Sequence, residues 1–146
     1  MPRDQHSLIA DVALLAEGKV LLVRYKDANK YDHQKGWFLP DDALQHLEHP
    51  DEGTRRILKE QLNFDASKPA LHYIESFKGN DKSWHLVFHY KGELPKIPAL
   101  LPSADVEKSE WFDLKNLPPP AEVAHHGWAL GTIKTVTQEV KNVQAG

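Results

Sequence analysis

The chain opens with two apolar segments that a turn separates. Ser7 to Leu15 is almost continuously apolar, and Val20 to Tyr25 is apolar again after the turn residues Glu17 and Gly18. Short continuous apolar runs bounded by turn residues are typical of strands that are buried on both faces. The pattern therefore predicts a hairpin of two buried strands. Gly36 to Pro40 is expected to add a short strand that the proline ends, followed by an acidic loop that contains histidines.

Two later segments have the spacing of amphipathic helices. Asp51 to Leu62 follows Pro50, which suits the first turn of a helix, and its apolar stripe contains Ile57, Leu58 and Leu62. A second helix is expected near the end of the chain, after a run of three prolines, and two glycines weaken it. The apolar stripe of this second helix consists of Val123, Leu130, Ile133, Val136 and Val140.

Further strands are expected between the two helices. Leu71 to Phe77 and Trp84 to Tyr90 flank the turn Lys78 to Lys82, and a final short strand is expected around Trp111. Strands that alternate with only two helices in this order predict an α+β or layered α/β/α domain. We expect a mixed sheet on which both helices pack.

Composition and charge narrow the class of protein. The chain has 146 residues and a formal net charge of -3, with 40% hydrophobic and 27% charged residues and no cysteine. This length and balance predict one globular domain over residues 1–146, and the slight acidity argues against nucleic acid as its partner. No apolar run approaches the roughly 20 residues of a membrane-spanning helix, so no membrane partner is expected. The absence of cysteine and of a signal-peptide pattern predicts a cytoplasmic protein without disulfides.

The segment from Gly36 to Phe64 carries the most specific motif. It reads GWFLPDDALQHLEHPDEGTRRILKEQLNF and resembles the Nudix hydrolase family, whose box runs Gly-x5-Glu-x7-Arg-Glu-hydrophobic-x-Glu-Glu-x-Gly-hydrophobic. The resemblance implies a Nudix-like α/β/α sandwich and pyrophosphohydrolase activity on a nucleoside diphosphate linked to another group. With no gap, the positions that agree with the box are Glu48, Arg56, Leu58, Glu60 and Phe64.

Four box positions depart from the family pattern. Asp42 and Asn63 replace glycines, and Ile57 and Gln61 replace glutamates. Residues 57, 60 and 61 share one face of a helix, where the family presents three carboxylates to a divalent metal ion. Here only Glu60 keeps a carboxylate, while Gln61 offers a neutral carbonyl and Ile57 offers no ligand. The resemblance therefore implies that Mg²⁺ or Mn²⁺ binds weakly or not at all and that hydrolysis is impaired.

Other acidic residues are candidates to replace the missing ligands. In one interpretation Asp41, Asp42, Glu48 and Glu60 build a rearranged metal site, and in the other the two aspartates form an acidic turn beside a solvated helix. Asp105 is either a further metal ligand or an ordinary surface charge. If a metal ion binds, the expected ligands are Glu60, Gln61 and Asp105. The candidate catalytic residues are Glu60 and Glu48.

Substrate binding has its own set of candidates. The guanidinium of Arg56 suits phosphate oxygens, although pairing with Glu52 and Glu60, four residues away on either side, would explain it equally well. Asp41 and Asp42, which replace the adjacent glycines that the family has before the helix, are candidates as well.

The histidines offer no obvious metal site. On the strand Trp84 to Tyr90, His85 and His89 share one face but lie about 13 Å apart, too far to share one ion. His85 is a candidate substrate-binding residue, and the alternative is that both are half-exposed strand residues. His125 and His126 are expected at the solvated start of the second helix.

These features leave three functional hypotheses. The first is a Nudix-fold, hydrolase-like protein that acts on or binds a nucleoside diphosphate linked to another group, with hydrolysis impaired by the loss of two box glutamates. The second is an active metal-dependent pyrophosphohydrolase that uses substitute carboxylates. The third is a non-catalytic nucleotide sensor or interaction domain. A small-molecule nucleotide is the expected partner, and a homodimer is compatible with the sequence.

Overall fold

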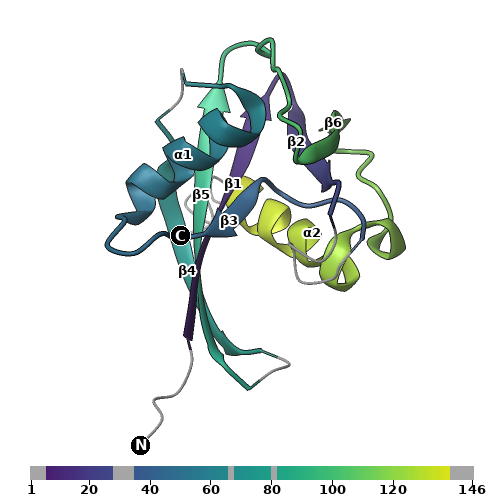
Figure 1. The fold of residues 1–146 in the computed structure, drawn as a ribbon. Helices are drawn as coiled ribbons and strands as arrows, with labels where there is room; N and C mark the ends of the chain where they lie inside the picture. Colours follow the sequence, from purple (N-terminus) through teal and green to yellow (C-terminus); the bar gives the residue numbers. More distant parts are fainter. Residues whose placement is uncertain (1–5, 28–34, 66–67, 80–81, 139–146) are drawn as a thin grey trace, which may run out of the picture.

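The fold is built on one mixed sheet with a helix on each face (Figure 1). The structure is a computed structural model that describes residues 6–27, 35–65, 68–79 and 82–138. Within these residues, neither helix is long and apolar enough to cross a membrane. In chain order the elements are β1 (His6–Ala16), β2 (Lys19–Tyr25), β3 (Asp41–Ala43), α1 (Pro50–Leu62), β4 (Ala70–Lys78), β5 (Trp84–Leu94), β6 (Val106–Asp113), the short 3₁₀ helix η1 (Pro120–Glu122) and α2 (Ala124–Thr137).

Strand β1 lies in the middle of the sheet and pairs with three other strands. It pairs antiparallel with β2 and β3 and parallel with β5, in a sheet whose order is β4-β5-β1-β2-β6. Leu15 lies opposite Val20 in the β1–β2 pair, which confirms the hairpin predicted at the start of the chain. A central strand with a helix over each face is buried on both faces, which explains its nearly continuous apolar sequence.

Alternate residues of β1 belong to two separate cores. Val12 packs in a buried cluster with Leu58 and Leu62 of α1, whereas Ala13 packs in a second cluster with Ile133 of α2. Successive side chains of a strand point to opposite faces of the sheet. The two helices therefore cover opposite faces, and the domain is an α/β/α sandwich of the α+β class, as predicted.

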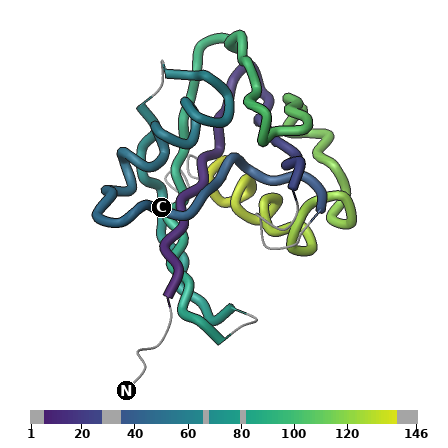
Figure 2. Tube along the Cα trace, in the orientation of Figure 1, coloured from purple at the N-terminus to yellow at the C-terminus, as the bar shows by residue number. Residues whose placement is uncertain are grey.

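Part of the sheet extends beyond both helices. Figure 2 shows the beginning of β1 and the hairpin of β4 and β5 running together away from the helical layers. Leu8, Ile74 and Trp84 lie on this part and are 37%, 50% and 53% exposed. The sheet thus has a portion that the helices cover and an arm that extends beyond them.

The strand predicted from Gly36 to Pro40 is not formed. Trp37 and Phe38 instead make isolated bridges to Val123 and Val23, and the rest of the segment is irregular. The prediction was wrong because an apolar run of this length also suits a segment that crosses between two buried clusters, and Trp37 and Phe38 belong to different ones.

Two strands differ in extent from the sequence prediction. The segment expected to be an acidic loop begins with β3, in which Asp41 and Asp42 lie opposite Asp11 and Ala10 of β1. Neither Asp41 nor Asp42 has a positive φ, so the loss of the box glycine is accommodated in extended backbone. Strand β6 is also longer than the short strand expected around Trp111, because it pairs with β2 over most of the length of that strand.

The ends of α1 are fixed by local hydrogen bonds. The helix begins at Pro50, one residue before the predicted start, and Nδ1 of His49 caps it by accepting a hydrogen bond from the Asp51 N–H at 3.0 Å. It ends at Asn63, which has a left-handed φ of 53°. Asn adopts this conformation more readily than most residues, so it can replace the glycine that closes the box in the family pattern.

The predicted C-terminal helix is confirmed over the described residues. Ile133 and Val136 are fully buried against the sheet, while Val140 lies outside the described residues. The first turn is irregular, because His125, His126 and Gly127 have left-handed φ values of 56°, 57° and 92°. This turn redirects the chain into α2 at the edge of the cavity described below.

Candidate functional site

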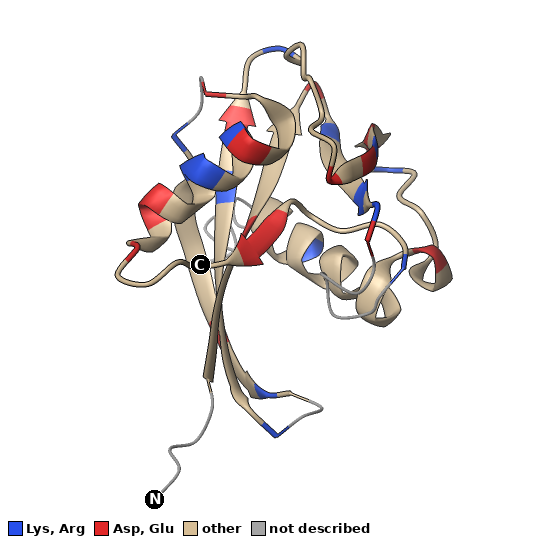
Figure 3. Cartoon of the chain, viewed as in Figure 1, with Lys and Arg blue, Asp and Glu red and all other residues tan. Residues whose placement is uncertain are grey.

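The fold of the box segment brings the carboxylates of Asp42, Glu48 and Glu60 together around the guanidinium of Arg56. Figure 3 shows the acidic strand β3 beside α1, which bears acidic and basic residues along its length. Arg56 donates from Nε to Glu48 Oε2 at 2.7 Å and from Nη2 to Glu48 Oε1 at 3.1 Å. Its Nη1 donates to Asp42 at 3.1 Å and to Glu60 at 3.2 Å, and its Nη2 also donates to the carbonyl of Ala43 at 3.0 Å. All five donors of the guanidinium are therefore used, and none remains for a phosphate.

This pairing sets the charge state of Glu48. The hydrogen bond from Arg56 lowers the pKa of the Glu48 carboxyl, and it outweighs burial, which acts in the opposite direction. The same bond raises the pKa of Arg56. Glu48 is thus an ionised hydrogen-bond acceptor, and its lowered pKa makes it a weak general base.

The three residues expected on one metal-binding face of α1 have different environments. Ile57 is fully buried, whereas the side chain of Glu60 is 55% exposed and bonds to Arg56. The Gln61 side chain is buried, with Oε1 accepting a hydrogen bond from the Tyr25 hydroxyl and Nε2 donating to the carbonyl of Asp41, both at 2.9 Å. The helix therefore does not present a common polar face at these positions. Ile57 and Gln61 tie it to the interior of the domain.

The residues at the box do not fit the three-carboxylate metal site of the family pattern. The carbonyl oxygen of Gln61 is already bonded to Tyr25, and the carboxylates of Glu60, Glu48 and Asp42 converge on a guanidinium. Within the described residues, no group of three or more His, Asp or Glu side chains is arranged to hold a metal ion. Arg56 supplies one positive charge, which these three carboxylates share.

Asp105 lies on the connection between β5 and β6, in which the N–H groups of Leu101 and Ser103 donate to the carbonyls of Leu62 and Gln61 at the end of α1. It occupies the turn before β6, where its carbonyl accepts a hydrogen bond from the N–H of Lys26 at 3.0 Å, and its side chain is exposed. The structure thus brings together Asp42, Glu48, Arg56 and Glu60 among the predicted site residues, and it places Asp105 at the end of β2.

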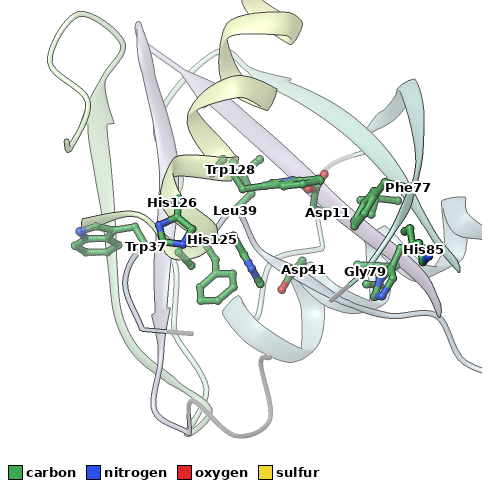
Figure 4. Close-up of a pocket in the computed structure, with 16 residues that line it drawn as sticks. Asp11, Trp37, Leu39, Asp41, Phe77, Gly79, His85, His125, His126 and Trp128 are labelled. Atoms are coloured by element: carbon green, nitrogen blue, oxygen red, sulfur yellow. The ribbon is translucent and has the colours of Figure 1, made fainter. Parts of the chain in front are cut away.

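A cavity of about 580 Å³ lies on the side of the sheet that α2 covers (Figure 4). Its walls come from β1, from the segment that leads into β3, from β4 and β5, and from the first turns of α2. The ring-bearing side chains that line it include Phe77, His85, His125, His126 and Trp128. The cavity combines flat apolar surfaces with polar groups, which is typical of small-molecule sites.

Two predicted substrate-binding residues line this cavity, and two do not. Asp41 and His85 are among its lining residues, whereas Asp42 and Arg56 belong to the carboxylate cluster. The ring of His85 stacks on Phe77 with centroids 5.1 Å apart. His125 and His126 lie at the start of α2, as expected, where His125 is half-buried and His126 is exposed, and both also line the cavity.

Asp11, which lines the cavity, is one end of a chain of three titratable side chains that the sequence analysis did not identify. Nδ1 of His89 lies 2.7 Å from Oδ1 of Asp11, and Nε2 of His89 lies 2.6 Å from Oε1 of Glu75. His89 is fully buried rather than half exposed, and Tyr73 stacks on its ring at 4.4 Å. The available signal in the sequence was Asp11, a charged residue inside an otherwise apolar strand, because a buried charge requires a partner.

The two carboxylates determine the charge of His89. Burial disfavours a charged imidazole, but the hydrogen bonds and charges of Asp11 and Glu75 outweigh this effect and raise the pKa of His89. Burial also raises the pKa of Asp11, against the opposing hydrogen bond from His89. Because both ring nitrogens face carboxylate oxygens, a protonated ring donates to each of them.

Comparisons with known proteins identify the family. A model of the NUDIX domain matches residues 6–130. No curated protein matches the sequence. Among similar solved structures, a MutT/nudix family protein from Enterococcus faecalis has 20% identity and a TM-score of 0.66, and the match covers 77% of this chain and 46% of that chain. A MutT NUDIX hydrolase from Burkholderia pseudomallei has 20% identity and a TM-score of 0.69, with 86% of this chain and 95% of that chain covered. A bifunctional NMN adenylyltransferase/ADP ribose pyrophosphatase from Francisella tularensis, complexed with AMP and a manganese ion, has 14% identity and a TM-score of 0.72, with 95% of this chain and 43% of that chain covered.

These similarities differ in what they show. At 20% identity or less, the solved structures establish the fold, and the chain spans less than half the length of the Enterococcus and Francisella proteins. The family model covers most of the chain, including the box segment and the strands that form the cavity. The chain therefore belongs to the Nudix family.

Proposed function

We propose that this domain binds a nucleoside diphosphate linked to another group in its cavity, and that hydrolysis by the box is impaired or absent. The observation that supports impaired hydrolysis is the burial of Ile57 and of the hydrogen-bonded Gln61 amide. These residues occupy two of the three positions at which the family pattern has metal-binding glutamates. Without those carboxylates, this face of the helix lacks two of the three charged oxygen ligands that the family pattern offers to a hard divalent cation.

Retention of binding is supported by the cavity. Its volume of about 580 Å³ lies in the range of about 300–1,000 Å³ that is usual for small-molecule sites. Phe77 and Trp128 provide ring surfaces for an aromatic base, and Lys78 provides a cation for a phosphate. The fold-related Francisella tularensis protein was crystallised with AMP, and we propose a nucleotide of the same chemical class for this chain.

The test separates binding from hydrolysis. ADP-ribose is titrated into the protein by calorimetry, once with Mg²⁺ and once with EDTA, and chromatography measures the release of AMP under both conditions. We expect binding of similar affinity in both buffers and little or no AMP, because the cavity and not a metal ion holds the ligand. Turnover in the usual enzymatic range of about 1–10³ s⁻¹ in Mg²⁺ would show an active hydrolase and contradict the proposal.

Two variants locate the binding site. Trp128→Ala removes a cavity wall and is expected to weaken binding, whereas Leu47→Ala changes a residue that is 91% exposed and outside the cavity. Equal binding by both variants, or no binding by the wild type, would argue against the cavity as a nucleotide site.

A further inference from the structure

The cavity has an aromatic wall built from two elements that are distant in sequence. Phe77 of β4 and Trp128 of α2 lie with ring centroids 4.9 Å apart and tilted by 50°. His85 of β5 also stacks on Phe77, with the two rings nearly parallel at 12°. Figure 4 shows Phe77, His85 and Trp128 around the same space as Asp11 and Asp41. This wall suits a flat ring, but it does not distinguish one ring from another.

Asp11 adds a polar group that can make that distinction. The residue is 5% exposed and lines the cavity, and its Oδ1 is bonded to His89. Among the residues that the structure describes, no hydrogen-bond partner is found for its second oxygen, Oδ2. A carboxylate oxygen only accepts hydrogen bonds while it is ionised. A ligand that enters the cavity therefore meets an Asp11 oxygen that can accept a hydrogen bond from it.

His89 and Glu75 hold this acceptor in place. An isolated buried carboxylate is costly and tends to take up a proton, but the imidazole of His89 donates to Asp11 and is itself held by Glu75 on its other side. Tyr73 stacks on the imidazole and restricts its rotation. The hydrogen bonds that link Glu75, His89 and Asp11 therefore fix the orientation of the Asp11 carboxylate, and His89 opposes the effect of burial, which raises the pKa of Asp11.

The charge around Asp11 also indicates which end of a nucleotide lies there. Asp41 is directly opposite Asp11 across the β1–β3 pair, so both side chains point to the same side of the sheet, and both line the cavity. Two neighbouring carboxylates repel a phosphate and favour the part of the ligand that carries N–H groups.

Building on the proposed function, we infer that Asp11 recognises an N–H donor on the edge of an aromatic base, with His89 and Glu75 as positioning residues. The ligand then lies with its base against Phe77 and Trp128 and its phosphates away from Asp11. The inference concerns which base is bound, whereas the proposed function concerns whether a nucleotide is bound at all.

The experiment compares bases that differ in donor groups. Calorimetry measures the affinity of ADP, of GDP and of purine riboside diphosphate, whose base has no N–H donor. A hydrogen bond to a charged group contributes about 1.5–3 kcal/mol, so at least one of ADP and GDP is expected to bind about 10-fold or more tightly than the donor-free analogue. Equal affinity for all three overturns the inference but leaves the proposed function standing. Failure of all three and of ADP-ribose to bind overturns both.

Variants assign the preference to Asp11. In Asp11→Asn the amide carbonyl is expected to accept from the protonated His89 ring, so the amide NH₂ faces the cavity and meets the donor of the base. The ratio of affinities between the donor-bearing and donor-free ligands should therefore be lost or inverted, and an unchanged ratio overturns the inference. Glu52→Gln, an exposed charge removal on α1, is the control and should keep the wild-type ratio.

Glu75→Gln tests the positioning role and does not depend on the stability of Asp11→Asn. The side chain of Glu75 is 36% exposed, so the fold should tolerate the change. Loss of the Glu75 charge weakens its hydrogen bond to His89. The ratio of affinities between the donor-bearing and donor-free ligands should therefore fall by several-fold while the protein stays folded. A merely structural role would weaken all three ligands equally and leave the ratio unchanged, which would overturn the assignment of Glu75.

Discussion

Arg56 contacts both carboxylate oxygens of Glu48, with Nε 2.7 Å from Oε2 and Nη2 3.1 Å from Oε1. Glu48 lies before α1 and Arg56 lies within the helix, so the pair joins the loop to the helix. The side chains are only 10% and 15% exposed, which limits screening by solvent and salt. In this chain the arginine and first glutamate of the box therefore have a structural role that does not depend on the missing glutamates.

Removal of Arg56 should destabilise the domain. Arg56→Ala leaves the carboxylates of Asp42, Glu48 and Glu60 without their shared cation, and the free energy of unfolding should fall by about 3 kcal/mol. Urea denaturation followed by circular dichroism measures the change. The neighbouring Arg55→Ala changes an exposed side chain and should cost less than about 0.5 kcal/mol. Similar stability of the two variants would show that the cluster contributes little.

A glutamate at position 57 should be tolerated poorly, although the family pattern has one there. Ile57 is fully buried, so Ile57→Glu places a carboxyl group in the core and should lower the free energy of unfolding by several kcal/mol in metal-free buffer. Ile57→Val keeps an apolar side chain and should cost only about 0.5–1.5 kcal/mol. Thermal unfolding of both variants with EDTA present makes the comparison. A melting temperature of Ile57→Glu equal to that of the wild type would mean that the side chain finds a polar environment.

Stability should decrease as the pH rises through the pKa of His89. Its folded-state pKa is raised by Asp11 and Glu75, with Tyr73 stacked on the ring. The stabilisation is therefore fully present below the ordinary histidine value of about 6.5 and is lost as the pH passes the higher value in the folded protein. The raised pKa of Asp11 acts in the same direction at lower pH. Urea midpoints measured from about pH 5 to pH 9 should show the decrease.

Glu75→Gln provides the control for this pH effect. It removes one of the two carboxylates that favour the charged imidazole, so the decrease in stability should move to lower pH. NMR titration of the His89 ring in both proteins measures the two pKa values directly. A higher pKa in Glu75→Gln, or an identical pH profile, would contradict the assigned pairing.

Gly36 and Gly131 should respond in opposite directions to substitution by alanine. Gly36 has a φ of +114°, and a Cβ there would lie 2.8 Å from the carbonyl oxygen of Glu122, so Gly36→Ala should cost about 1–3 kcal/mol. Gly131 lies in α2 with nothing within 4 Å of an added Cβ, and Gly131→Ala should gain about 0.5–1 kcal/mol. Differential scanning calorimetry of both variants tests the pair. Stabilisation by Gly36→Ala would show that the backbone near Glu122 moves freely.

The local pattern of the sequence was sufficient for the main elements and the family. Continuous apolar runs predicted the β1–β2 hairpin, and helical spacing predicted α1 to within one residue at its start. The spacing between Glu48 and Arg56 matched the family box, and the structure joins these two residues. Such features depend on neighbours within a few residues, so they can be deduced from the chain itself.

The environment of individual side chains was decided by tertiary structure. Helical geometry places residues 57, 60 and 61 close together on the helix. In the folded protein, however, Ile57 is buried in the core, Gln61 is buried with a hydrogen bond to Tyr25, and Glu60 is exposed. In the same way, His89 joined Asp11 only because β5 pairs with β1, although 78 positions separate the two residues in the chain. Burial and charge pairing depend on which elements pack over a face, and those contacts are non-local. Periodicity therefore indicates that a residue lies on a given face, and only packing decides whether that face meets solvent, a ligand or the core.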